Sequence, residues 1–129
     1  MTIPFQQYID SWMTKAAHDI MSAQRLLDIE PVILDNACFH CQQAVEKSLK
    51  AYLIYKGEEI EKTQDVIFLL GVCRKYDAVF STIDPMDINL YAVRGRYPDA
   101  SLMPDIEEAK LYFELANNIF TKVKERLVF

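Results

Sequence analysis

The chain has 129 residues, the length of one compact domain, which leaves no room for a catalytic domain beside a separate binding domain. Hydrophobic residues make up 51% of the sequence, so intrinsic disorder is excluded and one hydrophobic core is expected. Nineteen acidic residues against fourteen basic ones give a net charge of -5, which argues against a general DNA or RNA coat protein and requires any phosphate site to be local.

A first helix is predicted over residues 5–30, and Pro31 is expected to end it. Its apolar and small residues recur at alternating spacings of three and four, which places them in one stripe of a helix. These residues are Phe5, Tyr8, Ile9, Trp12, Met13, Ala16, Ile20, Ala23 and Leu27. A strand would require alternation of apolar and polar residues, which this segment lacks.

A second helix follows, for which Asp35 is the expected N-cap and Gly57 the expected stop. Its inner face is predicted to consist of Ala37, Cys38, Cys41, Ala44, Val45, Leu49, Tyr52 and Leu53. Thr63 is expected to cap a third helix. The buried face of that helix is predicted to contain Val66, Leu69, Leu70, Cys73 and Tyr76.

The last third of the chain is predicted to hold a short helix, a loop and a long helix. Asp84 followed by Pro85 is typical of a helix start, and this short helix is expected to reach about Ala92. Residues 94–104 are expected to form a loop, because Gly and Pro recur there. Asp105 and Glu108 have the spacing of a capping box for the last helix. Its buried stripe is Ala109, Tyr112, Phe113, Ala116, Phe120, Val123 and Leu127.

Four substantial helices and a short fifth one, joined by short connections, predict an all-α fold: an up-and-down bundle with antiparallel neighbours in one domain spanning 1–129. Cys38, Cys41 and Cys73 are an odd number of thiols in a chain without secretory features, so free thiols in a reducing cytoplasm are expected. No apolar stretch approaches the roughly 18 to 20 residues that span a bilayer, so we expect a soluble, cytoplasmic protein without a membrane partner.

Templates for cofactor and metal chemistry fail on spacing. A di-metal bundle needs Glu-x-x-His pairs, but Lys15 precedes His18 by three residues and Ala37 precedes His40. The Cys-x-x-Cys pair at residues 38–41 supplies half of a zinc site, yet it lies on an apolar helix face, where small thiols more often pack in the core. Three scattered glycines cannot form a phosphate loop. We therefore expect no metal and no cofactor.

A polar stripe on the second helix is the first candidate site. His40, Gln43, Lys47 and Lys50 are spaced three, four and three apart, so they project from one side of the helix. This stripe is basic in an acidic protein. The alternative interpretation is an ordinary solvated face on which Glu46 and Lys50 form an i, i+4 ion pair.

The second candidate site is the loop before the last helix. Arg94, Arg96 and Tyr97 combine two guanidinium groups, which can bind a phosphate, with an aromatic ring on which a base can stack. Gly95 would permit a close approach of the backbone. In the alternative interpretation one arginine pairs with Asp99 or Asp105, and Tyr97 packs beneath the loop.

The sequence resembles a known family at several of these places. Residues 37–51, Ala-Cys-Phe-His-Cys-Gln-Gln-Ala-Val-Glu-Lys-Ser-Leu-Lys-Ala, resemble the second-helix signature of HEPN domains, the higher eukaryote and prokaryote nucleotide-binding domains. Trp12 with residues 16–20 and 26–27 is similar to the first helix of that family, and residues 63–65 with 69–70 to the start of the third. Residues 96–99, Arg-Tyr-Pro-Asp, resemble the motif before the last helix, so the resemblance runs from about residue 12 to 127.

The resemblance implies a helical bundle, usually a homodimer, that serves as a substrate-binding partner of minimal nucleotidyltransferases, often in toxin-antitoxin modules. Many HEPN domains are metal-independent ribonucleases that carry an Arg followed closely by a His, but no histidine follows His40 in this chain. The sequence therefore predicts a non-catalytic module for a nucleotide or RNA-like phosphate ligand. Arg96 and Tyr97 would contact phosphate and base, and Arg94, Lys47 and Lys50 would supply further charge.

Two alternatives remain open at this point. The chain could be a ribonuclease toxin with altered active residues, such as Arg96 with Tyr97, or His40. It could also be a scaffold whose surface serves only dimerisation or docking of a partner protein. No broad DNA binding is expected in either case, because the chain is acidic.

Overall fold

The structure is a computed structural model that describes residues 4–92 and 103–129. Its four α-helices are α1 (Phe5–Asp28), α2 (Leu34–Tyr55), α3 (Val66–Tyr76) and α4 (Ile106–Arg126). Two 3₁₀ helices, η1 (Ala78–Thr82) and η2 (Ile88–Tyr91), lie between α3 and α4. The described residues contain no strand, so the predicted all-α bundle is confirmed. Among these helices, none has both the length and the apolar character that crossing a bilayer requires.

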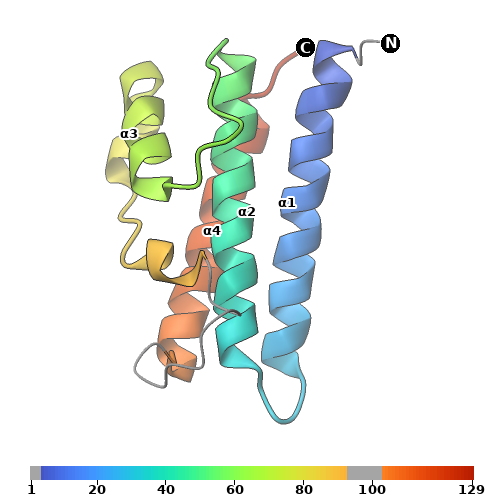
Figure 1. The fold of residues 1–129 in the computed structure, drawn as a ribbon, viewed down its shortest axis with the longest axis vertical. Coiled ribbons are helices and arrows are strands. Elements are labelled where there is room, and N and C mark those ends of the chain that lie inside the picture. The colour runs from blue at the N-terminus through green and yellow to red at the C-terminus, as the bar shows by residue number, and fades with distance from the viewer. Residues whose placement is uncertain (1–3, 93–102) are drawn as a thin grey trace.

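The bundle is arranged around α2, which lies between α1 and α3 and also packs on α4 (Figure 1). The chain reverses after α1, so α1 and α2 are antiparallel as expected. In contrast, α2 and α4 run in the same direction, because η1 and η2 lead the chain back along the bundle. Their carboxyl ends accordingly meet, and the Tyr55 hydroxyl donates a hydrogen bond to the Val128 carbonyl at 2.9 Å.

The central helix α2 is buried over most of its circumference. Fourteen of its 22 residues are buried, including every residue of the predicted inner face. Cys38, Leu49 and Leu53 are fully inaccessible to solvent. Because α1, α3 and α4 all contact α2, four polar or charged side chains of this helix are buried. This crowding determines the environment of the candidate site.

The buried face of α1 is rotated slightly around the helix from the predicted apolar stripe. Ile9, Met13 and Ala16 are buried as expected, whereas Phe5 is 51% exposed. Asp19 is buried in place of its neighbour Ile20, which is only half-buried. An acidic side chain therefore lies at the contact between α1 and α2, where the apolar spacing predicted a hydrophobic one.

The predicted starts of the second and third helices are each wrong by two residues. Ile33, and not Asp35, occupies the N-cap position of α2, and Asp35 lies in the first turn, where its carboxylate interacts favourably with the helix dipole. Asp65, and not Thr63, caps α3, because its Oδ1 accepts a hydrogen bond from the Phe68 N–H at 3.2 Å.

Asp65 also accepts a hydrogen bond from the Asn89 amide at 2.8 Å. Together with the cap, this bond holds the pKa of Asp65 below its usual range. At the last helix the predicted N-cap is confirmed, since Asp105 Oδ1 accepts from the Glu108 N–H at 2.8 Å. The short fifth helix is confirmed near its predicted place, but it is the 3₁₀ helix η2 and begins only at Ile88.

The sequence did not predict η1. Asp77 caps η1 by accepting from the Val79 N–H at 2.9 Å, and its other oxygen accepts from Arg126 of α4 at 2.6 Å. These hydrogen bonds, followed by the charge of Arg126, hold the pKa of Asp77 below its usual range. A single aspartate thus ties the end of α3 to the end of α4.

The three thiols are fully buried, and we expect them not to react in the folded protein. Burial raises the pKa of Cys73 to about 12, so only about one thiol in ten thousand is ionised at pH 8. Burial, followed by the nearby Cys38, also raises the pKa of Cys41 far above its usual range. Mass spectrometry after a brief iodoacetamide pulse should find no alkylation in buffer and three alkylated cysteines in denaturant. Rapid labelling of the native protein would contradict this burial.

Candidate ligand-binding site

The sequence-predicted site residues on the second helix lie along the side of α2 that faces α1. These residues are His40, Gln43, Lys47 and Lys50. The structure brings two of them to a common partner on α1 and places the other two in hydrogen bonds within the bundle. The loop residues Arg94, Arg96 and Tyr97, with Gly95, lie outside the described residues, so the ligand contacts expected of them stay predictions.

Asp19 of α1 is the common partner of His40 and Lys47. Its Oδ2 accepts a hydrogen bond from Lys47 Nζ at 2.6 Å, and its Oδ1 lies 2.8 Å from His40 Nδ1. The Asp19 side chain is 11% exposed, whereas those of Lys47 and His40 are 20% and 30% exposed. When Nδ1–H of a neutral His40 donates to Asp19, Nε2 is left as the acceptor. The carboxylate therefore fixes two partly accessible side chains at the surface of the helix pair.

Lys50 is held inside the bundle. Its ammonium donates to Glu46 Oε2 at 3.0 Å and to the Glu61 carbonyl at 2.7 Å. It also lies 5.3 Å from the centre of the Trp12 ring, within the range of a cation–π interaction. The i, i+4 ion pair with Glu46 is therefore present, but the interpretation as a solvated face is wrong at this end of the stripe, because the Lys50 side chain is only 4% exposed.

Gln43 belongs to the same internal network as Lys50. Its amide donates to Gln42 Oε1 at 2.7 Å, and Gln42 in turn donates to Glu46 Oε1 at 3.3 Å. Gln42 is fully buried, so its amide forms hydrogen bonds with Gln43 and Glu46 in place of water. Gln43 itself is half-buried and keeps one edge at the surface.

A hollow of about 300 Å³ opens beside this stripe. It is lined by Tyr8, Ser11, Trp12 and Lys15 of α1 and by Lys47 of α2. Its volume is at the lower end of the roughly 300–1,000 Å³ typical of small-molecule sites. Lys15 is exposed and forms no ion pair with the described residues, whereas Lys47 is held by Asp19. The hollow thus combines two ammonium groups with two aromatic rings.

Such a lining suits a ligand with an anionic group and a flat ring. Ammonium groups bind phosphate oxygens by charge-assisted hydrogen bonds, and aromatic faces stack on bases. Trp12 and Tyr8 pack edge to face, with their centroids 6.3 Å apart, which fixes the orientation of the rings. The indole N–H of Trp12 is buried and has no hydrogen-bond partner among the described residues. No group of His, Cys, Asp and Glu in residues 4–92 and 103–129 could hold a metal ion.

The sequence does not predict the α1 half of the site. Trp12 belongs to the predicted apolar stripe, and neither Lys15 nor Asp19 is among the predicted site residues. A signal was present, because residues 8, 12, 15 and 19 are spaced four, three and four apart and therefore share one side of α1. Which side of α1 faces Lys47 depends on the register of the two helices, which the sequence does not contain.

The arrangement of the helices defines the class of the protein as an all-α bundle built around the central helix α2. The family model described as HEPN domain matches residues 9–126. The chain therefore belongs to the HEPN domain family, and the resemblance seen in its second helix is confirmed. The search of curated proteins gives no match.

A solved structure supports the same fold. The crystal structure of an archaeal HEPN homologue is similar to this chain with a TM-score of 0.64 and 20% sequence identity. The match covers 92% of this chain and 96% of the archaeal one. At this level of identity the likeness shows the fold alone.

Proposed function

We propose that this HEPN domain is a non-catalytic module that binds a nucleotide or another phosphate-bearing ligand and presents it to a minimal nucleotidyltransferase partner. The single observation that carries the proposal is the hollow in which Lys15 and Lys47 lie beside Trp12 and Tyr8. In this proposal the lysines bind the phosphate and the rings contact the base. Arg94, Arg96 and Tyr97 keep the roles predicted from the sequence.

The two lysines have different roles in the proposal. Lys15 is exposed and brings a positive charge that no described carboxylate neutralises. Lys47 is held in place by Asp19, so its ammonium is already oriented before the ligand arrives. Lys50, which the sequence also placed among the ligand contacts, instead supports the Trp12 ring from inside the bundle.

The proposal predicts that a nucleotide changes the fluorescence of Trp12, which is the single tryptophan of the chain. With excitation at a wavelength that tyrosine does not absorb, the fluorescence of this chain comes from Trp12 and reports only on this hollow. We expect AMP to quench the emission saturably, because a base stacks on or near the ring, and inorganic phosphate to compete without quenching. Ligand at 100 times its dissociation constant should also stabilise the fold by about 2.7 kcal/mol in thermal unfolding.

Lysine variants provide the matched controls. Lys15→Ala and Lys47→Ala should each weaken AMP binding by about tenfold, whereas Lys110→Ala, an exposed lysine of α4, should leave it unchanged. If no mononucleotide or short RNA changes either the fluorescence or the unfolding temperature, the binding module is refuted. The protein would then be better described as a docking scaffold.

We also propose that the module is a cytoplasmic homodimer and, as in the toxin-antitoxin modules of the resemblance, works beside its partner enzyme. Light scattering should give twice the chain mass of 15.0 kDa, and a larger mass after addition of a nucleotidyltransferase partner. A monomer at all concentrations would contradict the dimer. It would leave the ligand site intact, because all of the described site residues belong to one chain.

A ribonuclease is the second candidate function, and the contact between Asp19 and His40 favours it. A carboxylate on Nδ1 orients an imidazole so that Nε2 can act as a general base. The test is cleavage of RNA in the presence of EDTA. Cleavage by the unaltered protein that is lost in His40→Ala or Arg96→Ala would support this candidate. RNA that stays intact, or cleavage indifferent to both substitutions, would leave the binding module as the function.

A further inference from the structure

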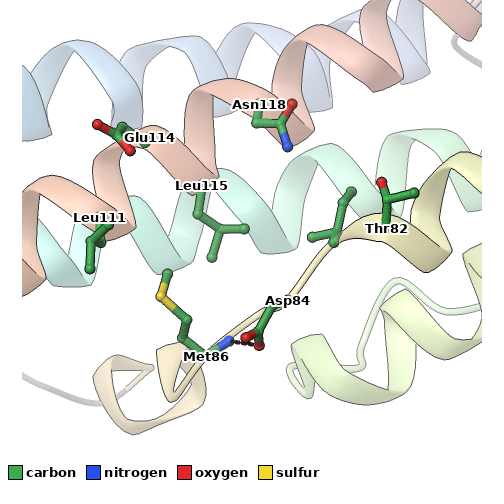
Figure 2. A pocket seen from close by; sticks show the side chains of 8 residues that line it. Thr82, Asp84, Met86, Leu111, Glu114, Leu115 and Asn118 are labelled. Carbon is green, nitrogen blue, oxygen red and sulfur yellow. Dashed lines mark hydrogen bonds between the residues drawn. The ribbon is translucent and has the colours of Figure 1, made fainter.

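A second hollow lies on the opposite side of the bundle from α1. It has a volume of about 320 Å³ and opens between α4 and the segment that joins η1 to η2 (Figure 2). From the segment it is lined by Thr82, Ile83, Asp84 and Met86, and from α4 by Leu111, Glu114, Leu115 and Asn118. The α4 residues are spaced three, one and three apart, so they form one stripe of that helix.

The floor of this hollow is apolar and part of it is exposed. Ile83 and Leu115 are 4% and 7% exposed and belong to the core, whereas Leu111 at the edge is 51% exposed. Figure 2 shows Met86 extending from the segment toward α4, where Leu111 and Leu115 face it. An apolar side chain of a partner could therefore be buried against Leu111 and Met86 without moving the core.

The charge of the hollow is entirely negative. Asp84 and Glu114 line it together with no lysine or arginine, and neither forms an ion pair with the described residues. Asp84 Oδ1 accepts a hydrogen bond from the Met86 N–H at 2.9 Å, which fixes the carboxylate and leaves its other oxygen for a ligand. Two carboxylates beside an apolar floor complement a cation that is carried next to an apolar side chain.

We propose that this hollow docks a segment of a partner protein that presents a lysine or arginine beside a leucine-like side chain. The cation would lie beside the second carboxylate oxygen of Asp84, with Glu114 adding negative charge at the other edge of the hollow, and the apolar side chain would lie against Leu111 and Met86. The net charge of -5 favours the approach of a basic segment. The inference does not rest on the nucleotide proposal, because the two hollows share no residue.

The test uses the full chain labelled with ¹⁵N and a short peptide, acetyl-Ser-Leu-Arg-Arg-Leu-Ser-amide. We expect saturable shifts of backbone amides in residues 82–86 and 111–118, and weaker binding as salt is raised. Two further peptides separate charge from apolar contact. One carries glutamate in place of arginine, the other serine in place of leucine, and neither should bind measurably.

Variants then assign the binding to this hollow. Glu114→Gln combined with Asp84→Asn should weaken the binding of the arginine peptide about tenfold, which corresponds to about 1.4 kcal/mol. Asparagine keeps the acceptor for the Met86 N–H, so the segment should stay folded. Leu111→Ala should weaken binding without unfolding the protein, since Leu111 is half-exposed. The control is Glu59→Gln, an exposed glutamate between α2 and α3.

The proposal is overturned if the arginine peptide produces no saturable shift, or if its affinity is the same in the double variant as in the Glu59→Gln control. It is also overturned if the glutamate or the serine peptide binds equally well. Loss of AMP binding in Lys15→Ala with peptide binding intact would show that the two sites act separately.

Discussion

Replacing Glu46 by alanine is expected to lower the free energy of unfolding by about 3 to 5 kcal/mol, the largest effect among the predictions made for this protein. The side chains of Glu46 and Lys50 are 9% and 4% exposed, so the substitution leaves an ammonium buried without its carboxylate. The Glu61 carbonyl, which accepts from the same ammonium at 2.7 Å, offsets only part of this loss. Urea unfolding followed by circular dichroism measures the change.

The matched control removes both charges at once. Glu46→Gln combined with Lys50→Met keeps the approximate volume of both side chains and buries no charge, so it should cost less than Glu46→Ala alone. If Glu46→Ala costs under about 1 kcal/mol, the pair behaves as an exposed surface ion pair. The burial of Lys50 beneath Trp12 would then be wrong.

Leu49→Ala is expected to destabilise the protein by about 2 to 5 kcal/mol, because Leu49 is fully buried in the central helix. For a domain of this size such a change lowers the unfolding temperature by on the order of 10 °C. Scanning calorimetry measures the shift. Leu90→Ala is the control, since Leu90 is 51% exposed and its truncation should change the stability by no more than about 0.5 kcal/mol. Equal losses from both variants would contradict the assignment of Leu49 to the core.

Much of the fold could be predicted because helical periodicity is a local property of the sequence. The spacing of the apolar residues located the four α-helices, and the predicted inner face of α2 is buried in full. The parallel course of α2 and α4 could not be predicted in the same way. It depends on the path of the connection through η1 and η2, and 3₁₀ turns of four or five residues have no apolar period long enough to recognise.

The predicted start of the third helix is wrong because two capping residues compete there. Thr63 and Asp65 both have the chemistry of an N-cap, and nothing in the local sequence favours one over the other. In the structure Asp65 also binds Asn89, a residue more than twenty positions away, and this tertiary contact favours it. Local sequence rules thus predict where a helix lies, but its first residue also depends on long-range contacts.

The candidate site could be predicted only on the helix that carries the signature. The lysines and the histidine of α2 were recognised because they break the charge pattern of an acidic chain. Their partner Asp19 was not, because a carboxylate inside an apolar stripe contradicts the rule by which the stripe was found. The distance between Asp19 and Lys47 is set by the register of two helices, and that register follows from the packing of the whole core.

The contacts of α2 with every other α-helix also determine how the protein unfolds. Neither α3 nor α4 can leave the bundle without exposing the apolar residues of α2, and α1 covers the remaining side. A fragment that lacked α2 would keep only the smaller contact between α1 and α4, which is less extensive than the contact of either helix with α2. The domain should therefore lose its structure in a single all-or-none step, and splitting the chain between α1 and α2 should yield two pieces that fold only together.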